Sequence, residues 1–196
     1  RYRGLVTIDL SDPDRLRVAG RLPFQAQPLE MYLRDGRAYI VMSDYFTFWQ
    51  YDPDADPLGF HGSQILIVDV SDPAKPRQIG VFQNDPKTFN RGELAIDGDF
   101  AYCTALTGLV IVNIADPANP KLAKSVDIQG RVTDVVAQDG YAFVAAGPAG
   151  VRVFDVHDPN HPKEIGYYNP GDQFAATQLA VQPAPGGNSY YLYVAN

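Results

Sequence analysis

Residues 64–73 read Gln-Ile-Leu-Ile-Val-Asp-Val-Ser-Asp-Pro, an apolar run that ends at an Asp-Pro turn signal. A short apolar run bounded by turn residues is typical of a buried strand. The Asp-Pro pairs that close such runs begin at positions 12, 72, 116 and 158, and the last two spacings are in the low forties. That period predicts one four-stranded β-propeller blade per repeat. The pattern occurs four times, at residues 4–13, 64–73, 108–117 and 150–159.

The other half of each repeat has the pattern of a hairpin. Residues 30–41 predict a strand, a tight turn at Asp35-Gly36 and a second strand. No segment shows a sustained 3.6-residue period, so we expect essentially no helix. The fold class predicted is all-β, a β-propeller of four-stranded antiparallel blades. Counterparts of the hairpin lie at 93–104, 134–145 and, in a stretched version, 178–195.

Two acidic positions recur at the turns. Proline after Asp presets a type I turn, and the Asp side chain can accept a hydrogen bond from the backbone of that turn. The Asp of each Asp-Pro pair is the first recurring position. The second position lies three residues before each pair and is interpreted as structural because it recurs so evenly. Its members are Asp9, Asp69, Asn113 and Asp155. The single cysteine, Cys103, lies in an apolar run and is interpreted as core filler.

The repeats supply four blades' worth of strands in what we expect to be one domain over residues 1–196. The repeat units cover about 4–63, 64–107, 108–149 and 150–196, with an insertion at 45–62. By analogy with other propellers, the chain begins with the outer half of a blade and ends with the inner half of another. The expected ranges are 4–22 for the first half, 28–82, 91–127 and 131–168 for three complete blades, and 175–195 for the last half. The two halves either pair and close a four-bladed ring or belong to a larger propeller, and the second arrangement is slightly favoured.

Residues 65–76 (ILIVDVSDPAKP) and 109–120 (LVIVNIADPANP) resemble the LVIVD-repeat family of bacterial and archaeal surface proteins, which are β-propellers. The resemblance covers nearly the whole chain. It implies an extracellular, cell-surface or periplasmic location and a binding or scaffolding role.

Composition argues against two classes of partner. The formal net charge is −7 and no Lys/Arg cluster offsets it, so nucleic acid is a poor candidate partner. No apolar stretch approaches the roughly 20 residues of a membrane-spanning helix, so we expect no membrane insertion.

One candidate metal site follows from the repeat. Aligning the first strands on their turns places Glu30, Glu93, Asp134 and Gln178 at one shared position, which in a propeller forms a ring around the axis. Such oxygen ligands suit a hard cation such as Ca²⁺, although no cofactor is firmly expected. The alternative is that these side chains form hydrogen bonds or salt bridges with neighbouring backbone and arginines.

The insertion is the second candidate site. It carries the only tryptophan, and clustered aromatic residues on a loop make good anchors for a protein, peptide or glycan. The alternative is a folded lid that completes the core. The alternation of Asp52, Asp54 and Asp56 resembles a calcium loop but fails where Gly and Glu are needed. The ligand-binding candidates are Tyr45, Phe48, Trp49, Tyr51 and His61.

Two functions follow from these sites. The leading one is non-enzymatic recognition of a protein, peptide or glycan through one mouth of the propeller. The alternative is a metal-dependent hydrolase or lyase that uses the carboxylate ring, which would also need a general base. No Cys/His or Ser/His/Asp grouping stands out, so no catalytic residue is assigned and an enzyme is the less favoured hypothesis.

Overall fold

The computed structural model describes residues 4–24, 26–43, 64–83, 89–105, 108–171, 173–186 and 189–196. In these ranges the chain forms sixteen β-strands and no helix, as predicted. The strands belong to two compact units. Unit 1 comprises Arg1–Pro86 and Pro117–Asn119, and unit 2 comprises Lys87–Asp116 and Pro120–Asn196.

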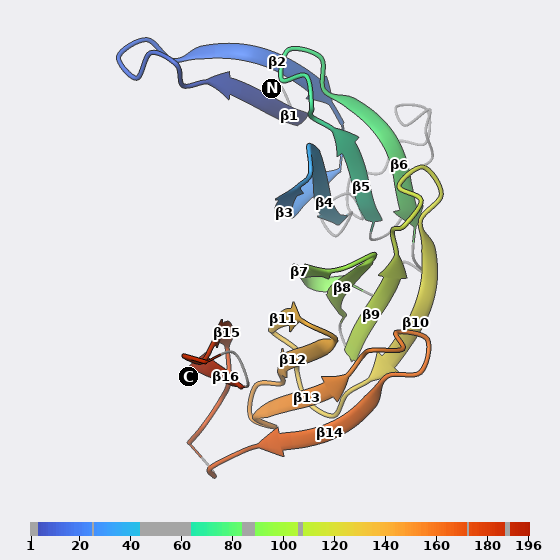
Figure 1. The fold of residues 1–196 in the computed structure, drawn as a ribbon, viewed down its shortest axis with the longest axis vertical. Helices are drawn as coiled ribbons and strands as arrows, with labels where there is room; N and C mark the ends of the chain where they lie inside the picture. Colours follow the sequence, from blue (N-terminus) through green and yellow to red (C-terminus); the bar gives the residue numbers. More distant parts are fainter. Residues whose placement is uncertain are drawn as a thin grey trace, which may run out of the picture. The chain divides into compact units, whose positions relative to one another are not determined.

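Unit 1 contains a two-stranded and a four-stranded antiparallel sheet. Strands β1 (Gly4–Asp9) and β2 (Arg17–Pro23) form the first. The second has the order β3-β4-β5-β6 (Figure 1), with bounds Gln27–Arg34, Arg37–Ser43, Gln64–Asp69 and Arg77–Gln83.

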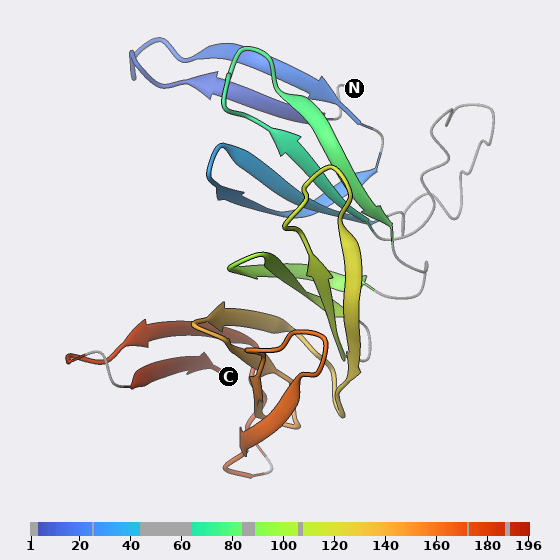
Figure 2. The same cartoon turned by 45° about the vertical axis from the view of Figure 1, so that its right-hand side comes forward.

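Unit 2 contains two four-stranded antiparallel sheets and a final hairpin. The sheet β7-β8-β9-β10 has the bounds Phe89–Asp97, Phe100–Ala105, Gly108–Asn113 and Lys121–Asp127. It is strongly twisted, since its edge strands β7 and β10 run in clearly different directions (Figure 2). The sheet β11-β12-β13-β14 has the bounds Asp134–Gln138, Tyr141–Ala145, Val151–Asp155 and Lys163–Tyr168. Strands β15 (Gln178–Pro183) and β16 (Tyr190–Ala195) pair with each other.

The predicted blades are confirmed. Three four-stranded sheets match the three complete blades, and the two-stranded sheets match the expected halves at 4–22 and 175–195. Closure of the halves into one blade is not detected, because β1–β2 and β15–β16 are separate sheets in the described part of the chain. The single domain over 1–196 stays a prediction.

The Asp-Pro turns have the predicted chemistry. The carbonyl of Asp72 accepts the N–H of Lys75 at 3.0 Å, and its side chain accepts the N–H of Ala74 at 2.9 Å. The second recurring acidic position is structural as well, because Asp69 Oδ1 accepts both the N–H and the hydroxyl of Ser71. The same acceptance of the N–H two residues later occurs at Asp9, Asn113 and Asp155.

A β-bulge recurs in the strand that follows each Asp-Pro turn. The pairing of this strand shifts by one residue in all four cases, so one residue in each of these strands has no cross-strand partner. These residues are Ala19, Ile79, Ala123 and Ile165. Because the bulge is repeated, it is a regular feature of these blades. It reverses the face of the sheet to which the residues beyond it point, compared with a strand without the bulge.

The cores are built from the apolar runs of the repeat. In unit 1, Ile40, Leu66 and Val68 are buried in one cluster. In unit 2, a larger cluster joins two neighbouring sheets and includes Tyr102 from β8 and Phe154 from β13. Burial raises the pKa of Tyr102 to about 12. Cys103 is buried, which agrees with its interpretation as core filler.

Candidate functional site

The connections of a blade divide between its two ends. The Asp-Gly hairpin and the Asp-Pro turn lie at one end of a four-stranded meander, so the connection between its second and third strands lies at the other. We call this other end, where the first strand of the sheet begins, the connector end. In the third blade it carries the β10–β11 and β12–β13 connections. In the first blade the insertion at 45–62 falls between β4 and β5 in the sequence and lies outside the described residues.

Three of the four residues predicted to share a register position have a cross-strand partner in the hairpins. Glu30 pairs with Val41, Asp134 with Ala145 and Gln178 with Ala195, and each pair lies at the connector end of its hairpin. Glu93 lies just before Leu94, which pairs with Cys103, and its N–H donates to the Thr104 hydroxyl at 3.2 Å. Each of the four residues thus lies near the connector end of its hairpin.

Asp134 uses its carboxylate to join two sheets of unit 2. One oxygen accepts the N–H of Val135 at 2.8 Å, and the other accepts the N–H of Leu179 at 2.5 Å. Desolvation raises the pKa of this half-buried carboxyl, although both hydrogen bonds act in the opposite direction. These contacts agree with the alternative to a metal site, in which the side chain forms hydrogen bonds with neighbouring backbone groups.

The remaining ring residues differ in environment. Glu93 is half-buried and Gln178 is exposed, whereas Glu30 is half-buried in unit 1. Across the described ranges, no group of three or more His, Cys, Asp or Glu side chains could hold a metal ion. The four-residue ring as a metal site stays a prediction.

The second predicted site lies outside the described residues. This applies to all five aromatic candidates, Tyr45, Phe48, Trp49, Tyr51 and His61. The other two histidines are exposed on an Asp-Pro turn, where His157 Nδ1 contacts Asp155 at 2.8 Å and His161 Nδ1 contacts Asp158 at 2.8 Å.

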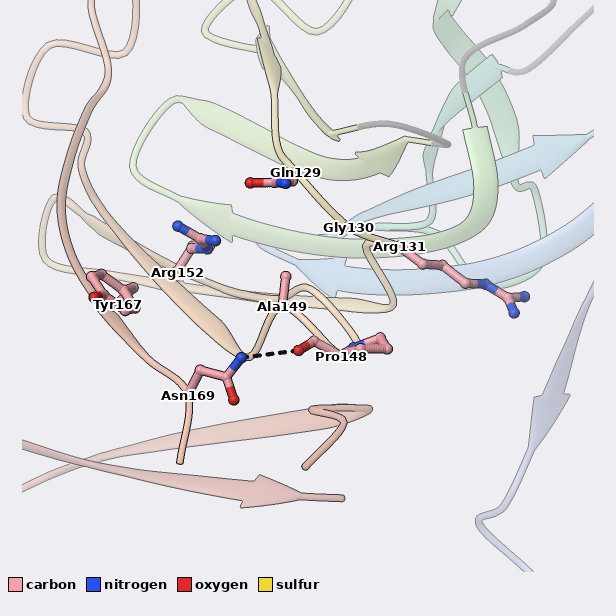
Figure 3. A pocket seen from close by; sticks show the side chains of 8 residues that line it. All are labelled: Gln129, Gly130, Arg131, Pro148, Ala149, Arg152, Tyr167 and Asn169. Atoms are coloured by element: carbon pink, nitrogen blue, oxygen red, sulfur yellow. Dashed lines mark hydrogen bonds between the residues drawn. The ribbon is translucent and has the colours of Figure 1, made fainter. Parts of the chain in front are cut away.

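A cavity that the sequence reasoning missed opens at the connector end of the third blade. Its volume is about 600 Å³, within the range of small-molecule sites. The wall residues come from the two connections, from strands β13 and β14 and from the segment that follows β14 (Figure 3). They are Gln129, Gly130, Arg131, Pro148, Ala149, Arg152, Tyr167 and Asn169.

Specific contacts fix the walls of this cavity. The side chain of Asn169 donates to the carbonyl of Pro148 at 3.0 Å (Figure 3) and accepts the N–H of Gly171 at 3.1 Å. Gly130 has φ +111°, and a Cβ there would lie 2.6 Å from the carbonyl oxygen of Ala146 and 2.8 Å from the Cβ of Ala149. Only glycine lets the two connections approach this closely, so the cavity is largely preformed.

Arg152 is the main charged group of the cavity. Its Nη1 donates to Glu164 at 2.9 Å, and its guanidinium lies over the Tyr167 ring at 5.4 Å from the centroid. Its Nε is buried and has no hydrogen-bond partner among the described residues. Figure 3 shows Gln129, Arg152 and Tyr167 on one side of the cavity, whereas the side chain of Arg131 extends away from them.

The sequence did hold a signal for Arg152. The repeat alignment places it where the other runs have Val6, Leu66 and Val110, and two of these are buried in their blades. Its cross-strand partner is Tyr167, whereas Leu66 pairs with Val81. A charged residue inside an otherwise apolar run therefore marked this blade as different.

The repeat, its turns and its four-stranded sheets agree with a comparison to known families. A family model of the LVIVD repeat matches residues 59–83, 91–128 and 129–170, over half of the chain. The chain belongs to the LVIVD repeat family. Its membership confirms the resemblance seen in the repeat sequences.

Among solved structures, this LVIVD repeat chain is similar to the crystal structure of the computationally designed Ika4 protein. The TM-score is 0.57 at 12% sequence identity, over 88% of this chain and 94% of that one. At this identity the likeness shows the fold alone, that of propeller blades. No curated protein matches the chain. In the described ranges no helix has the length and apolar character needed to cross a membrane.

Proposed function

We propose that this LVIVD repeat chain is a non-enzymatic binding or scaffolding propeller that works outside the cytoplasm, at the cell surface, in the periplasm or extracellularly. It recognises a protein, peptide or glycan through the connector ends of its blades. The observation that carries the proposal is the preformed cavity at the connector end of the third blade. Loops held on a rigid sheet scaffold are where recognition sites are usually found.

Two features support binding at this end. The cavity combines a partly buried arginine with an exposed tyrosine, and both residue types are common at the energetic centres of interfaces. The aromatic insertion belongs to the β4–β5 connection, which is the counterpart of the β12–β13 connection that lines the cavity. The two candidates therefore belong to equivalent connections of two different repeats.

The experiment is a screen of the whole chain against a glycan array and a peptide array. We expect retention of at least one class of ligand, with no change of ligand mass after prolonged incubation. Absence of retention on both arrays would contradict the proposal, and a hydrolysed or eliminated product would favour the enzymatic alternative.

A further inference from the structure

We propose that the cavity at the connector end of the third blade binds a sugar residue that carries one carboxylate, a uronate within an otherwise neutral glycan. This inference rests on the proposed binding function and names the ligand class for one site.

Arg152 supplies the cationic group. The Glu164 pair takes up Nη1, and Nε lacks a hydrogen-bond partner among the described residues. Because Nε is buried, an acceptor in the cavity would approach the part of the guanidinium side chain that stays exposed. Its planar fork matches the two oxygens of a carboxylate better than a point charge would. The side chain is 20% exposed, so part of it faces the cavity and solvent.

Tyr167 and Gln129 supply the contacts to a sugar ring. Tyr167 is 71% exposed while Arg152 lies over its ring, which leaves aromatic surface accessible beside the cation. A sugar ring has an apolar C–H face that packs on such a surface. The Gln129 amide both donates and accepts, which suits hydroxyl groups. Figure 3 shows these three side chains on the same side of the cavity.

A peptide fits the lining less well. Peptides are usually anchored by large apolar side chains in apolar pockets or by pairing with a sheet edge. The cavity lining contains no Leu, Ile, Met, Phe or Trp among the described residues. An acidic peptide is therefore the competing outcome of the test.

The overall charge limits the ligand to few carboxylates. The chain has a formal net charge of −7, which opposes the approach of a polyanion. Two arginines at the cavity, one of them already paired with Glu164, offset that charge only locally. A glycan with a single uronate gains the local attraction without the full long-range repulsion.

The test uses pairs of oligosaccharides that differ only in whether one residue is a uronate or the corresponding neutral hexose. Binding to the whole chain is measured by isothermal titration calorimetry at low and moderate salt. A peptide with one Glu among Gly and Ser residues provides the competing carboxylate. We expect the uronate form to bind at least about tenfold more tightly than its neutral pair, with the difference shrinking at higher salt.

Three variants locate the binding. Arg152→Gln should remove the preference for the uronate, and Tyr167→Ala should weaken binding of both members of a pair by about tenfold. The matched control is Tyr191→Ala, which removes a 58% exposed tyrosine on β16 and should leave binding unchanged. Because Tyr167 is an exposed side chain, its variant keeps the test valid if Arg152→Gln destabilises the blade.

Equal binding of the uronate and neutral members, or binding unaffected by both cavity variants, would overturn the inference while leaving the proposed function intact. Tighter binding of the peptide than of every uronate would overturn it in favour of an acidic peptide. If neither the oligosaccharides nor the peptide binds while the arrays do retain a ligand, the uronate inference is overturned. Recognition would then belong to another part of the connector ends.

Discussion

The carboxylate of Asp134 accepts the backbone N–H of Leu179 at 2.5 Å, although the two residues are 45 positions apart in the chain. This bond joins β11, the first strand of the third blade, to β15 of the final hairpin. Thr133 strengthens the junction, because its hydroxyl donates to the carbonyl of Ala176 at 3.0 Å. Gly147 and Ala176 add two backbone hydrogen bonds between the β12–β13 connection and the segment before β15.

Asp134→Asn should loosen this junction. The amide oxygen can still accept one of the two backbone N–H groups. The amide N–H₂ group faces the other N–H and cannot accept it, so one hydrogen bond to a charged group is lost. We expect faster hydrogen exchange at the Leu179 amide, with only a small change in the free energy of unfolding because the neutral amide also avoids the desolvation of the carboxylate. Denaturant unfolding and amide exchange measure the two effects. Asp127→Asn, on exposed β10, is the control, and unchanged exchange at Leu179 would contradict this role of Asp134.

The pH dependence of stability should have opposite signs at two aspartates. Desolvation raises the pKa of Asp134 above its ordinary value of 3.8, so the folded state holds this proton more strongly than the unfolded state. Its contribution to stability therefore falls as the pH rises from 3.8 through the raised pKa.

Asp69 should behave in the reverse way. The Ser71 hydroxyl, the Ser71 N–H and then Arg77 lower its pKa, so its contribution is present above 3.8 and is lost as the pH falls through the lowered pKa. A carbon-detected NMR titration of the carboxyl groups should place Asp134 above 3.8 and Asp69 below it. A pKa of Asp134 below that of Asp69 would refute desolvation as the main influence on Asp134 and hydrogen bonding as the main influence on Asp69.

Gly20→Ala should destabilise the first sheets, because a Cβ at Gly20 would lie 2.3 Å from the carbonyl oxygen of Pro73 and 2.7 Å from Cδ of Pro76. We expect a cost of about 1–3 kcal/mol, typical of overpacking. Gly166 is the matched control, since it has the equivalent place on β14 and a Cβ there meets nothing within 4 Å. Denaturant unfolding of both variants measures the contrast, and equal costs would show that close packing at Gly20 is not the cause.

Calcium should leave the thermal midpoint unchanged after treatment with EDTA, because both oxygens of Asp134 already accept backbone N–H groups. The melt is repeated with added Mg²⁺ and Zn²⁺, since an ion that binds only the folded state raises the midpoint. A rise with any ion that disappears in Glu93→Gln would restore the carboxylate ring as a metal site and revive the enzymatic alternative.

The strands and turns were predictable because each repeat presents the same local chemistry. Apolar runs such as Ile65–Val68 are buried, and the Asp-Pro pairs at 12, 72 and 158 carry their own turn acceptor, so pattern and structure coincide. The cavity was not predictable in the same way. A register counted from the Asp-Pro turn would place Gly166 opposite Arg152, whereas the bulge at Ile165 moves Tyr167 there. That single residue decides which face carries the aromatic ring.

The repeat pattern also could not predict the contacts between sheets. Nothing local in the sequence links Asp134 to the N–H of Leu179, or Asn169 to the carbonyl of Pro148, because these bonds depend on where connections meet in space. The charged residue inside an apolar run was visible at Arg152, but its partners Glu164 and Tyr167 required the observed pairing.

The most direct test of binding at the connector end is a two-dimensional NMR titration of the isotope-labelled chain with a single-uronate oligosaccharide. We expect the largest shifts at the amides of Gly130, Ala149 and Asn169 and at the Nε–H of Arg152, with the Asp-Pro turns unaffected. Shifts confined to the Asp-Pro turns, or no saturable shifts at any resolved signal, would contradict the account.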